Sequence, residues 1–228
     1  MITIEPIARI QSDFPSKFGI PRQSGLVDAL RSTVIFEPAY RNADALRGIE
    51  DFSHLWLIWQ FSENVRQEWS PTVRPPRLGG NTRLGVFATR SPFRPNNLGL
   101  SCVRLIGIEH TADHGTVLHV AGADLMDGTP IFDVKPYIPY SDCRIDATGG
   151  FTDTTKREVL DVDISPTLLQ HLPQDKQAAL MGVLAQDPRP SYQKDPERIY
   201  GLPFGGFDIR FRVNGNRLTV TEIKELKP

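Results

Sequence analysis

The sequence predicts a mainly β fold: a single-sheeted β-barrel domain of a non-Rossmann kind, followed by a small α+β domain. The first two thirds of the chain contain many short apolar or alternating segments separated by glycine and proline turns. This pattern is typical of barrels and curled sheets. Strands do not alternate regularly with long helices, as a doubly wound parallel sheet would require. We therefore expect a barrel rather than a Rossmann-type sheet.

The first domain is expected to span residues 1–145. Its strands are predicted where residues alternate in polarity or form short continuous apolar runs. They cover residues 2–10, 32–36, 55–61, 83–89, 100–108, 116–121 and 131–134. Asn42 can cap a short helix over residues 43–47, which Gly48 would end.

The second domain, residues 146–228, follows a change of composition after Tyr140. Residues 141–155 are rich in Asp, Thr and Gly and are predicted to form a linker. A strand over 156–164, a helix opening at Ser165-Pro166 and a second helix from Pro173 to about Ala185 follow. Finally, Asn214-Gly215 separates strand-like residues 207–213 and 217–224, a strong hairpin signal.

Composition excludes several classes of protein. No apolar run approaches the roughly 20 residues that span a bilayer, and the N-terminus lacks the features of a secretory signal. The two cysteines, Cys102 and Cys143, lack metal spacing, which fits a reducing cytoplasm and argues against a disulfide framework. The histidines show no metal spacing either, and we expect structural roles for them: His54, His110, His114, His119 and His171.

The charge distribution is more informative than the net charge of −1. No acidic residue occurs between Glu68 and Glu109, and every cation in that stretch is an arginine. Arginine forks onto phosphates, carboxylates and base edges, and prolines and glycines interleave these arginines in shaped loops. An anionic ligand or RNA is therefore favoured over an ordinary solvated face.

Several segments are too rich in polar and turn residues to be simple connections. They are residues 18–23, 71–81, 87–99 and 124–130, the last followed by 133–137. Each alone could be an ordinary turn. Together, in one β domain that lacks a phosphate loop and a GxGxxG motif, they indicate an unconventional ligand site.

These segments resemble the TsaA-like (YaeB-type) family of tRNA methyltransferases. The matching strings run in family order from near the N-terminus to the second domain. They are Pro21-Arg22-Gln23, residues 48–56, residues 74–80, residues 88–99, residues 124–130 with 133–137, and residues 184–190. The chain departs from the family at Ser62-Glu63, where many members have His-Gln, and at Asn97-Leu98, where Pro-Ile is common.

The resemblance implies a β-barrel methyltransferase, usually a homodimer, that binds S-adenosylmethionine. The implied reaction is methylation of N6 in N6-threonylcarbamoyladenosine, which lies just 3′ of the anticodon in threonine tRNA. The C-terminal domain is implied to help recognise tRNA. The implied cofactor contacts are Pro21, Arg22, Gln23, Ser62, Glu63, Arg90, Leu100, Ser101, Asp124, Leu125, Met126 and Asp127.

The residue chemistry agrees with this implied cofactor. A cationic sulfonium and a zwitterionic amino-acid end require both carboxylates, such as Asp124 and Asp127, and arginines, such as Arg22 or Arg90. Methyl transfer depends chiefly on alignment, with Asp127 or Asp133 as candidate bases for the N6 proton. Phe93 or Tyr137 could stack on an exposed base. The candidate RNA contacts are Arg74, Arg77, Arg83, Arg94, Lys135 and Arg189.

Two other functions remain open from the sequence. The chain could be an RNA-binding module that uses its arginines without chemistry and binds tRNA in a salt-dependent manner. Its carboxylates at Asp124, Asp127 and Asp133 disfavour that reading, because they would repel phosphate. Alternatively, it could use the same cofactor to methylate a small metabolite.

Overall fold

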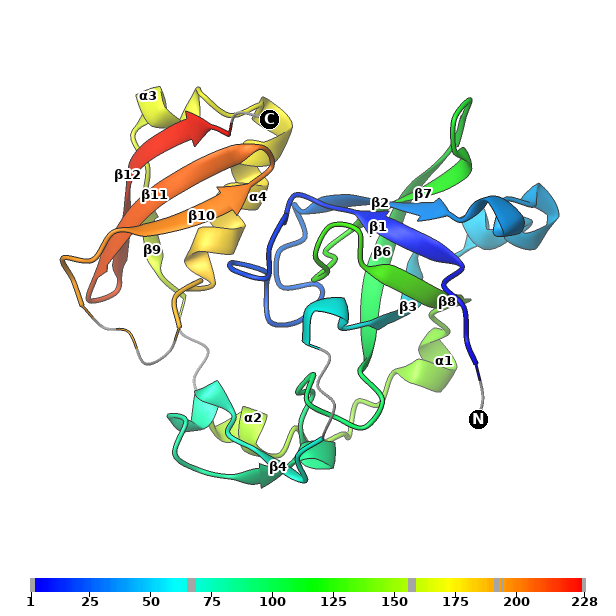
Figure 1. The fold of residues 1–228 in the computed structure, drawn as a ribbon, viewed down its shortest axis with the longest axis horizontal. Helices are drawn as coiled ribbons and strands as arrows, with labels where there is room; N and C mark the ends of the chain where they lie inside the picture. Colours follow the sequence, from blue (N-terminus) through cyan, green and yellow to red (C-terminus); the bar gives the residue numbers. More distant parts are fainter. Residues whose placement is uncertain (1–2, 65–68, 156–158, 191–192, 194, 227–228) are drawn as a thin grey trace.

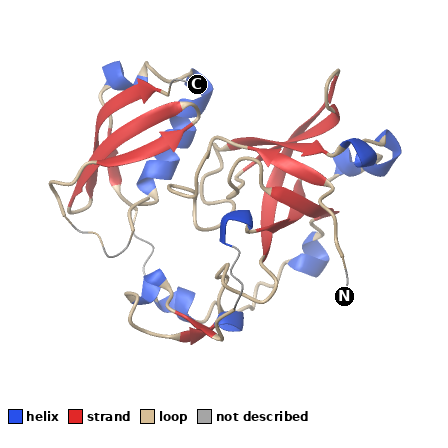
Figure 2. Ribbon diagram, in the orientation of Figure 1, coloured by secondary structure: helices blue, strands red, loops and turns tan. Residues whose placement is uncertain are grey.

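A computed structural model of the 228-residue chain describes residues 3–64, 69–155, 159–190, 193 and 195–226. Within these residues the chain is mainly β, with short helices and one longer helix (Figures 1 and 2). The predicted mainly β class with a smaller C-terminal α+β part is confirmed. Among the described residues, none of the helices combines the length and apolarity needed to cross a bilayer.

Six strands from the first part of the chain form a closed barrel in the order β1-β2-β7-β6-β3-β8, with antiparallel neighbours throughout. Their bounds are β1 (Ala8–Gln11), β2 (Arg31–Phe36), β3 (His54–Gln60), β6 (Leu98–Thr111), β7 (Gly115–Ala121) and β8 (Pro130–Pro136). Closure leaves these strands without a free edge, which removes a template for aggregation.

Strand β3 shows why the barrel core forms. Leu55, Leu57 and Trp59 are buried and alternate with side chains that are only half-buried on the outer face. Burial along β3 therefore alternates with a period of two residues, although the sequence of this strand is a continuous apolar run. Each buried leucine stabilises the fold by about 1.5–3 kcal/mol relative to an exposed one.

Two of the strands predicted in the first domain are shorter than expected. In the stretch 2–10, strand begins only at Ala8 among the described residues, because Pro6 cannot donate a ladder hydrogen bond. In the stretch 83–89, strand β5 covers only Leu84–Gly85, and a 3₁₀ turn, η6 (Val86–Ala88), follows. Strand β5 pairs with β4 (Thr72–Val73) to form a two-stranded ribbon outside the barrel (Figure 1).

The connection from β2 to β3 consists of three 3₁₀ turns, η1 (Pro38–Tyr40), η2 (Ala43–Leu46) and η3 (Ile49–Asp51). The expected short helix at residues 43–47 is therefore a 3₁₀ turn. The Asn42 side chain accepts from the Asp44 backbone N–H at 3.0 Å, and Gly48 has a φ of 85°, as the predicted cap and stop require.

The C-terminal sheet has the order β10-β11-β12-β9, so that β12 lies between β11 and β9. Its strands are β9 (Asp161–Asp163), β10 (Tyr200–Phe204), β11 (Phe207–Asn214) and β12 (Arg217–Glu225), and α3 (Pro166–Leu169) and α4 (Gln174–Ala185) follow β9. Strands β11 and β12 pair through Asn214↔Arg217, and Ser165 caps α3, which confirms the predicted hairpin and helix start.

Three sequence predictions for this half need correction. Strand β9 is shorter than the predicted strand over 156–164, of which residues 156–158 lie outside the described part of the chain. The predicted linker contains two short helices, α1 (Pro139–Asp142) and α2 (Phe151–Thr154). Strand β10 is absent from the sequence prediction, because Gly201 and Pro203 disguise its alternation of buried side chains.

The segment between β1 and β2 connects the two halves of the molecule. Phe14, Val27 and Leu30 are buried in the same hydrophobic core as α4 and the C-terminal sheet. In Figure 1 this blue segment lies between the barrel and that sheet. A Cβ atom on Gly182 of α4 would lie 2.6 Å from Val27 Cγ1, so the helix and the segment pack at close range.

Replacing Gly182 with alanine is expected to destabilise the protein. In an exposed helix this change stabilises by about 1 kcal/mol, but here the added methyl group would overlap the stiff, β-branched Val27. The midpoint of thermal unfolding should therefore fall in Gly182→Ala. The double variant Gly182→Ala/Val27→Ala should lose less stability than the sum of the single variants; additive losses would contradict this packing.

Candidate functional site

A buried chain of hydrogen bonds lies at the centre of the candidate site. Trp59 Nε1 donates to Ser101 Oγ at 2.9 Å, and Ser101 Oγ donates to Asp124 Oδ1 at 2.5 Å. Trp59 and Ser101 are buried, so each of their polar atoms needs a partner inside the protein. Gly99 makes the arrangement possible: a Cβ atom there would lie 2.3 Å from the Trp59 indole.

Asp124 ends this chain as a largely buried carboxyl group. Burial raises its pKa, because the charged form loses hydration. Hydrogen bonds from Ser101 and from the Ser24 backbone, together with the positive charge of Arg90, act in the opposite direction without cancelling the rise in pKa. A carboxyl group with a perturbed pKa that is held by specific partners is a candidate for a functional role.

Residues from three distant segments meet around Asp124. The Arg90 guanidinium donates to Gln23 Oε1, and Gln23 Nε2 donates to the Arg22 carbonyl. Ser24 Oγ accepts from the backbone N–H of Cys102 on β6 at 3.1 Å. The structure thus brings together Gln23, Arg90, Ser101 and Asp124, all of which the sequence singled out.

Two glycines allow the loops at this site to approach each other. The Gly25 N–H donates to the Gly122 carbonyl at 2.8 Å, and both residues have positive φ angles. A Cβ atom on Gly122 would lie 3.2 Å from Gly25 Cα, which is tighter than a side chain normally tolerates. A larger residue at Gly122 would push the Gln23 loop away from Asp124, whereas Gly25 is favoured only by its positive φ.

The remaining predicted cofactor residues have varied surroundings. Pro21 is buried and Arg22 is exposed in the same loop, and Leu100 is 55% exposed on β6. The Leu125 side chain is fully buried in the barrel core and Met126 is half-buried, so a contact at Leu125 would come from its backbone. Ser62 and Glu63 are exposed in η4 (Ser62–Asn64), directly after Phe61.

The two candidate bases have partners of their own. Asp127 is exposed, and its Oδ1 accepts from the Ser12 backbone N–H at 2.9 Å in the turn that follows β1. Asp133 lies on β8 opposite Ile58, and its Oδ2 pairs with Lys135 Nζ at 2.9 Å. In the described part of the chain, neither carboxylate belongs to the hydrogen-bonded group around Asp124.

The arginines among the candidate RNA contacts divide into two groups. Arg74 is exposed and Arg77 is half-buried in η5 (Pro76–Leu78), while Arg83 Nη1 donates to Thr72 Oγ1 at 3.2 Å on the same ribbon. In contrast, the side chains of Arg94 and Arg189 form hydrogen bonds within their own loops. Arg94 Nη1 donates to the Thr89 carbonyl at 3.0 Å, and Arg189 forks onto Asp187 at 2.8 and 2.9 Å.

The predicted cofactor loop also contacts the C-terminal half. A cavity of about 190 Å³ lies between residues 17–22 and residues 186–190, lined in part by Arg22 and Arg189. Beside it, a Cβ atom on Gly19 would lie 2.2 Å from Leu202 Cδ1. The second half of the chain therefore helps to position the loop that carries Arg22 and Gln23.

Sequence reasoning missed Trp59, Ser24 and Gly99 as parts of the site. The sequence places Trp59 only in a core strand, and its link to Ser101 depends on the alignment Trp59↔Gly99 between β3 and β6. The available signal was a glycine directly before the predicted Leu100-Ser101 contact. A glycine within a strand often marks such a close approach.

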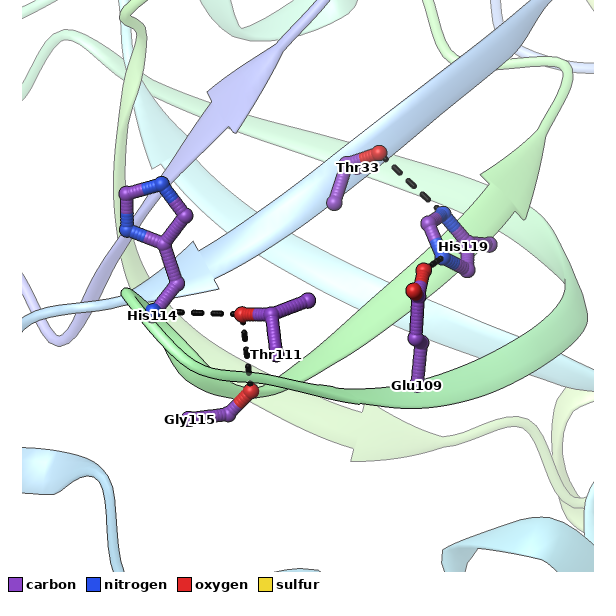
Figure 3. A network of polar contacts seen from close by, with 6 residues as sticks. All are labelled: Thr33, Glu109, Thr111, His114, Gly115 and His119. Atoms are coloured by element: carbon purple, nitrogen blue, oxygen red, sulfur yellow. Dashed lines mark hydrogen bonds and ion pairs between the residues drawn. The ribbon is translucent and has the colours of Figure 1, made fainter.

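The side chains of His54, His110 and His119 have hydrogen-bond partners within the fold. Figure 3 shows His119 on β7 between Thr33 Oγ1 at 3.2 Å and Glu109 Oε2 at 2.8 Å, which links three neighbouring strands. The same view shows the His114 backbone in the turn closed by Thr111. Among the described residues, no group of three or more His, Cys, Asp or Glu side chains could hold a metal ion.

The variant Asp124→Asn is expected to be more stable than the parent protein at neutral pH. Because burial raises the pKa of this carboxyl group in the folded state, stability falls as the pH rises from the unfolded pKa to the folded pKa, and the full cost is present above the folded pKa. The neutral amide avoids this cost and can still accept from Ser101. The gain should shrink as the pH falls through the raised folded pKa toward about 4, the ordinary pKa that the group has in the unfolded chain.

Thermal unfolding of both proteins between pH 4 and 8 measures this difference. Asp146→Asn, at an exposed position, is the matched control and should show no comparable trend. A loss of stability in Asp124→Asn at neutral pH would mean that the hydrogen bonds to the carboxylate outweigh its burial.

Comparison with known proteins identifies the family. Residues 9–143 match the model of the tRNA-methyltransferase O N-terminal domain, and residues 157–226 match that of the TrmO C-terminal domain. The chain is 41% identical over 218 residues to a tRNA (adenine(37)-N6)-methyltransferase of Escherichia coli (strain K12), covering 92% of each protein. It is 42% identical over 217 residues to a putative S-adenosylmethionine-dependent methyltransferase RcsF of Pseudomonas aeruginosa, covering 92% of this chain and 91% of the relative.

The fold agrees with this comparison. A crystal structure of TrmO from Pseudomonas aeruginosa aligns with a TM-score of 0.80 at 34% identity and covers 98% of both chains. The resemblance found in the sequence is thereby confirmed across both halves of the molecule. The chain belongs to the TsaA-like, tRNA-methyltransferase O (TrmO) family.

Proposed function

We propose that this protein is an S-adenosylmethionine-dependent tRNA methyltransferase that methylates N6 of adenosine 37. Relatives named tRNA (adenine(37)-N6)-methyltransferase and S-adenosylmethionine-dependent methyltransferase support this activity. The structural observation that carries the proposal is the meeting of a largely buried carboxyl group, Asp124, with an arginine, Arg90. A ligand with both charges at one end is complementary to such a pair.

The residues present fit S-adenosylmethionine. The Asp124 carboxylate can accept from an ammonium or from ribose hydroxyls, and Arg90 or the exposed Arg22 can bind a carboxylate. The exposed Leu100 side chain next to Ser101 offers an apolar surface. When bound, this cofactor supplies an electrophilic methyl group carried on a positively charged sulfur.

The contribution of the protein chain is chiefly alignment. Trp59 and Ser101 hold Asp124 in one orientation, and Gln23 does the same for Arg90. Fixed partners of this kind reduce the entropy lost in reaching the reactive geometry. Asp127 and Asp133 remain the proposed candidates to accept the N6 proton, and in this role either would have to give up a present partner.

The finer proposal concerns the substrate. We infer from the family resemblance that the acceptor is N6-threonylcarbamoyladenosine in threonine tRNA. In this proposal residues 1–145 bind the cofactor and residues 146–228 help to bind tRNA. Exposed Arg74 and the neighbouring Arg77 and Arg83 contribute phosphate contacts, with Arg94, Lys135 and Arg189 as further candidates.

A cytoplasmic homodimer completes the proposal. Leu98, Leu100, Ile106 and Ile108 on β6 are each at least 38% exposed, and a second copy of the chain could cover such a surface. Measurement of the molar mass in solution tests this assembly. The cytoplasmic location follows from the proposed substrate, threonine tRNA.

Cofactor binding is the first test. Calorimetric titration with S-adenosylmethionine should show saturable binding without tRNA. Asp124→Asn and Arg90→Ala should each weaken binding by about tenfold or more, because each removes a charge-assisted interaction. Asp146→Asn and Arg47→Ala are the matched controls at exposed positions and should bind normally. Normal binding by both site variants would place the cofactor elsewhere.

The arginines of the ribbon provide the second test. The variant Arg74→Ala/Arg77→Ala should lose most tRNA methylation while keeping its cofactor affinity. The slope of log Kd for tRNA against log salt concentration should become shallower by about one for each phosphate that the variant no longer neutralises. Full turnover on tRNA in this variant would rule out the proposed role of these arginines.

The acceptor is tested separately with purified threonine tRNA and its unmodified transcript. Methyl transfer, followed by mass spectrometry of the nucleosides, should occur only where the threonylcarbamoyl group is present. Equal transfer to both would support adenosine 37 as the acceptor and reject the finer proposal. Transfer to neither, with normal cofactor binding, would favour a small-metabolite acceptor.

A further inference from the structure

Two large aromatic side chains stack on each other at the surface. The ring centroids of Trp69 and Phe87 are 6.0 Å apart, with an angle of 26° between the planes. Trp69 is 50% exposed and Phe87 is 71% exposed. An exposed aromatic pair of this size is costly in water unless a partner covers it.

The local backbone holds this pair in place. Both residues lie where the β4–β5 ribbon begins and ends: Trp69 precedes β4 and Phe87 follows β5. The Val86 N–H donates to the Pro71 carbonyl at 2.9 Å, and Thr72 pairs with Gly85. The two rings are therefore presented by a hydrogen-bonded turn rather than by independent loops.

The charges along this part of the chain are of one sign. From Trp69 to Ile108 the sequence contains arginines but no acidic residue and no lysine. Arg74, Arg77 and Arg83 lie in the connection between the two strands of the ribbon. Flat rings beside guanidinium groups are the combination that binds single-stranded nucleic acid, since bases stack and phosphates pair with the cations.

The pair also stands close to the candidate cofactor site along the chain. Arg90, three residues after Phe87, donates to Gln23 in the loop that meets Asp124. Along the chain, Trp69 precedes the three arginines, and Phe87 lies between them and Arg90.

We propose that Trp69 and Phe87 form a stacking platform for one unpaired base of the RNA substrate. This inference rests on the proposed function and adds to it a contact that recognises a base by its flat face. Charge favours RNA over a second copy of the chain as the occupant. The arginines of one copy would repel the same arginines of another copy, whereas RNA phosphates would attract them.

The test compares alanine and aromatic replacements in the full-length protein. Trp69→Ala and Phe87→Ala should each raise the KM and Kd for tRNA by about fivefold or more, with cofactor affinity unchanged. Trp69→Phe should restore most of the binding, because it keeps a stacking ring. Tyr140→Ala, at a position that is 88% exposed outside the ribbon, is the matched control and should bind normally.

The salt dependence of tRNA binding distinguishes the contribution of stacking from that of charge. The aromatic variants should shift the plot of log Kd against log salt without changing its slope, whereas Arg74→Ala/Arg77→Ala should make it shallower. An anticodon stem-loop with an abasic nucleotide at the stacked position should bind the parent protein as weakly as the intact loop binds Phe87→Ala. Phe87→Ala should bind the abasic loop no more weakly than it binds the intact loop.

Several outcomes would overturn the platform. Unchanged tRNA binding in both alanine variants, while the parent protein still methylates tRNA, would reject the platform and leave the proposed function intact. A change of molar mass in these variants would assign the rings to an interface between copies instead. If the parent protein binds cofactor but methylates no tRNA, the proposed function fails; alanine variants that still bind RNA fivefold more weakly would then support the platform alone.

Discussion

The structure depends on the packing of one segment, residues 12–30, into a core built mainly by the opposite end of the chain. Phe14, Val27 and Leu30 are buried with α4 and the C-terminal sheet, while Gly25 between them is hydrogen-bonded to Gly122 of the barrel. The segment therefore cannot move with only one half of the molecule. Since it carries Arg22 and Gln23, the geometry of the candidate site is fixed by both cores at once.

The same segment explains why a buried carboxyl group is tolerated at Asp124. An isolated carboxylate inside a barrel would be strongly destabilising. Here Ser101 and Ser24 donate to Asp124, and Arg90 adds a positive charge nearby. Ser24 belongs to the segment, so the packing of the C-terminal core also supplies part of the polar environment of this group. Burial still raises its pKa, and the fold thus retains some instability at a candidate functional position.

The sequence predicted the parts of this protein that depend on local patterns. Short strands, the Asn42 cap and the Asn214-Gly215 hairpin follow from residue types at fixed spacing. It did not predict β10, whose glycine and proline hide the pattern, or the role of Trp59, which depends on the alignment of β3 with β6. Family resemblance selected Ser101 and Asp124, but only the three-dimensional arrangement could join them to Trp59 and Ser24.

The position of β12 in the C-terminal sheet affects the order in which the molecule can be completed. This last strand is internal, lying between β11 and the much earlier β9, with which it pairs in parallel. During synthesis on the ribosome, the sheet stays open until the final strand has emerged. The core that receives Phe14, Val27 and Leu30 is incomplete until then. The loop that carries Gln23 is therefore held in place only once β12 has joined the sheet.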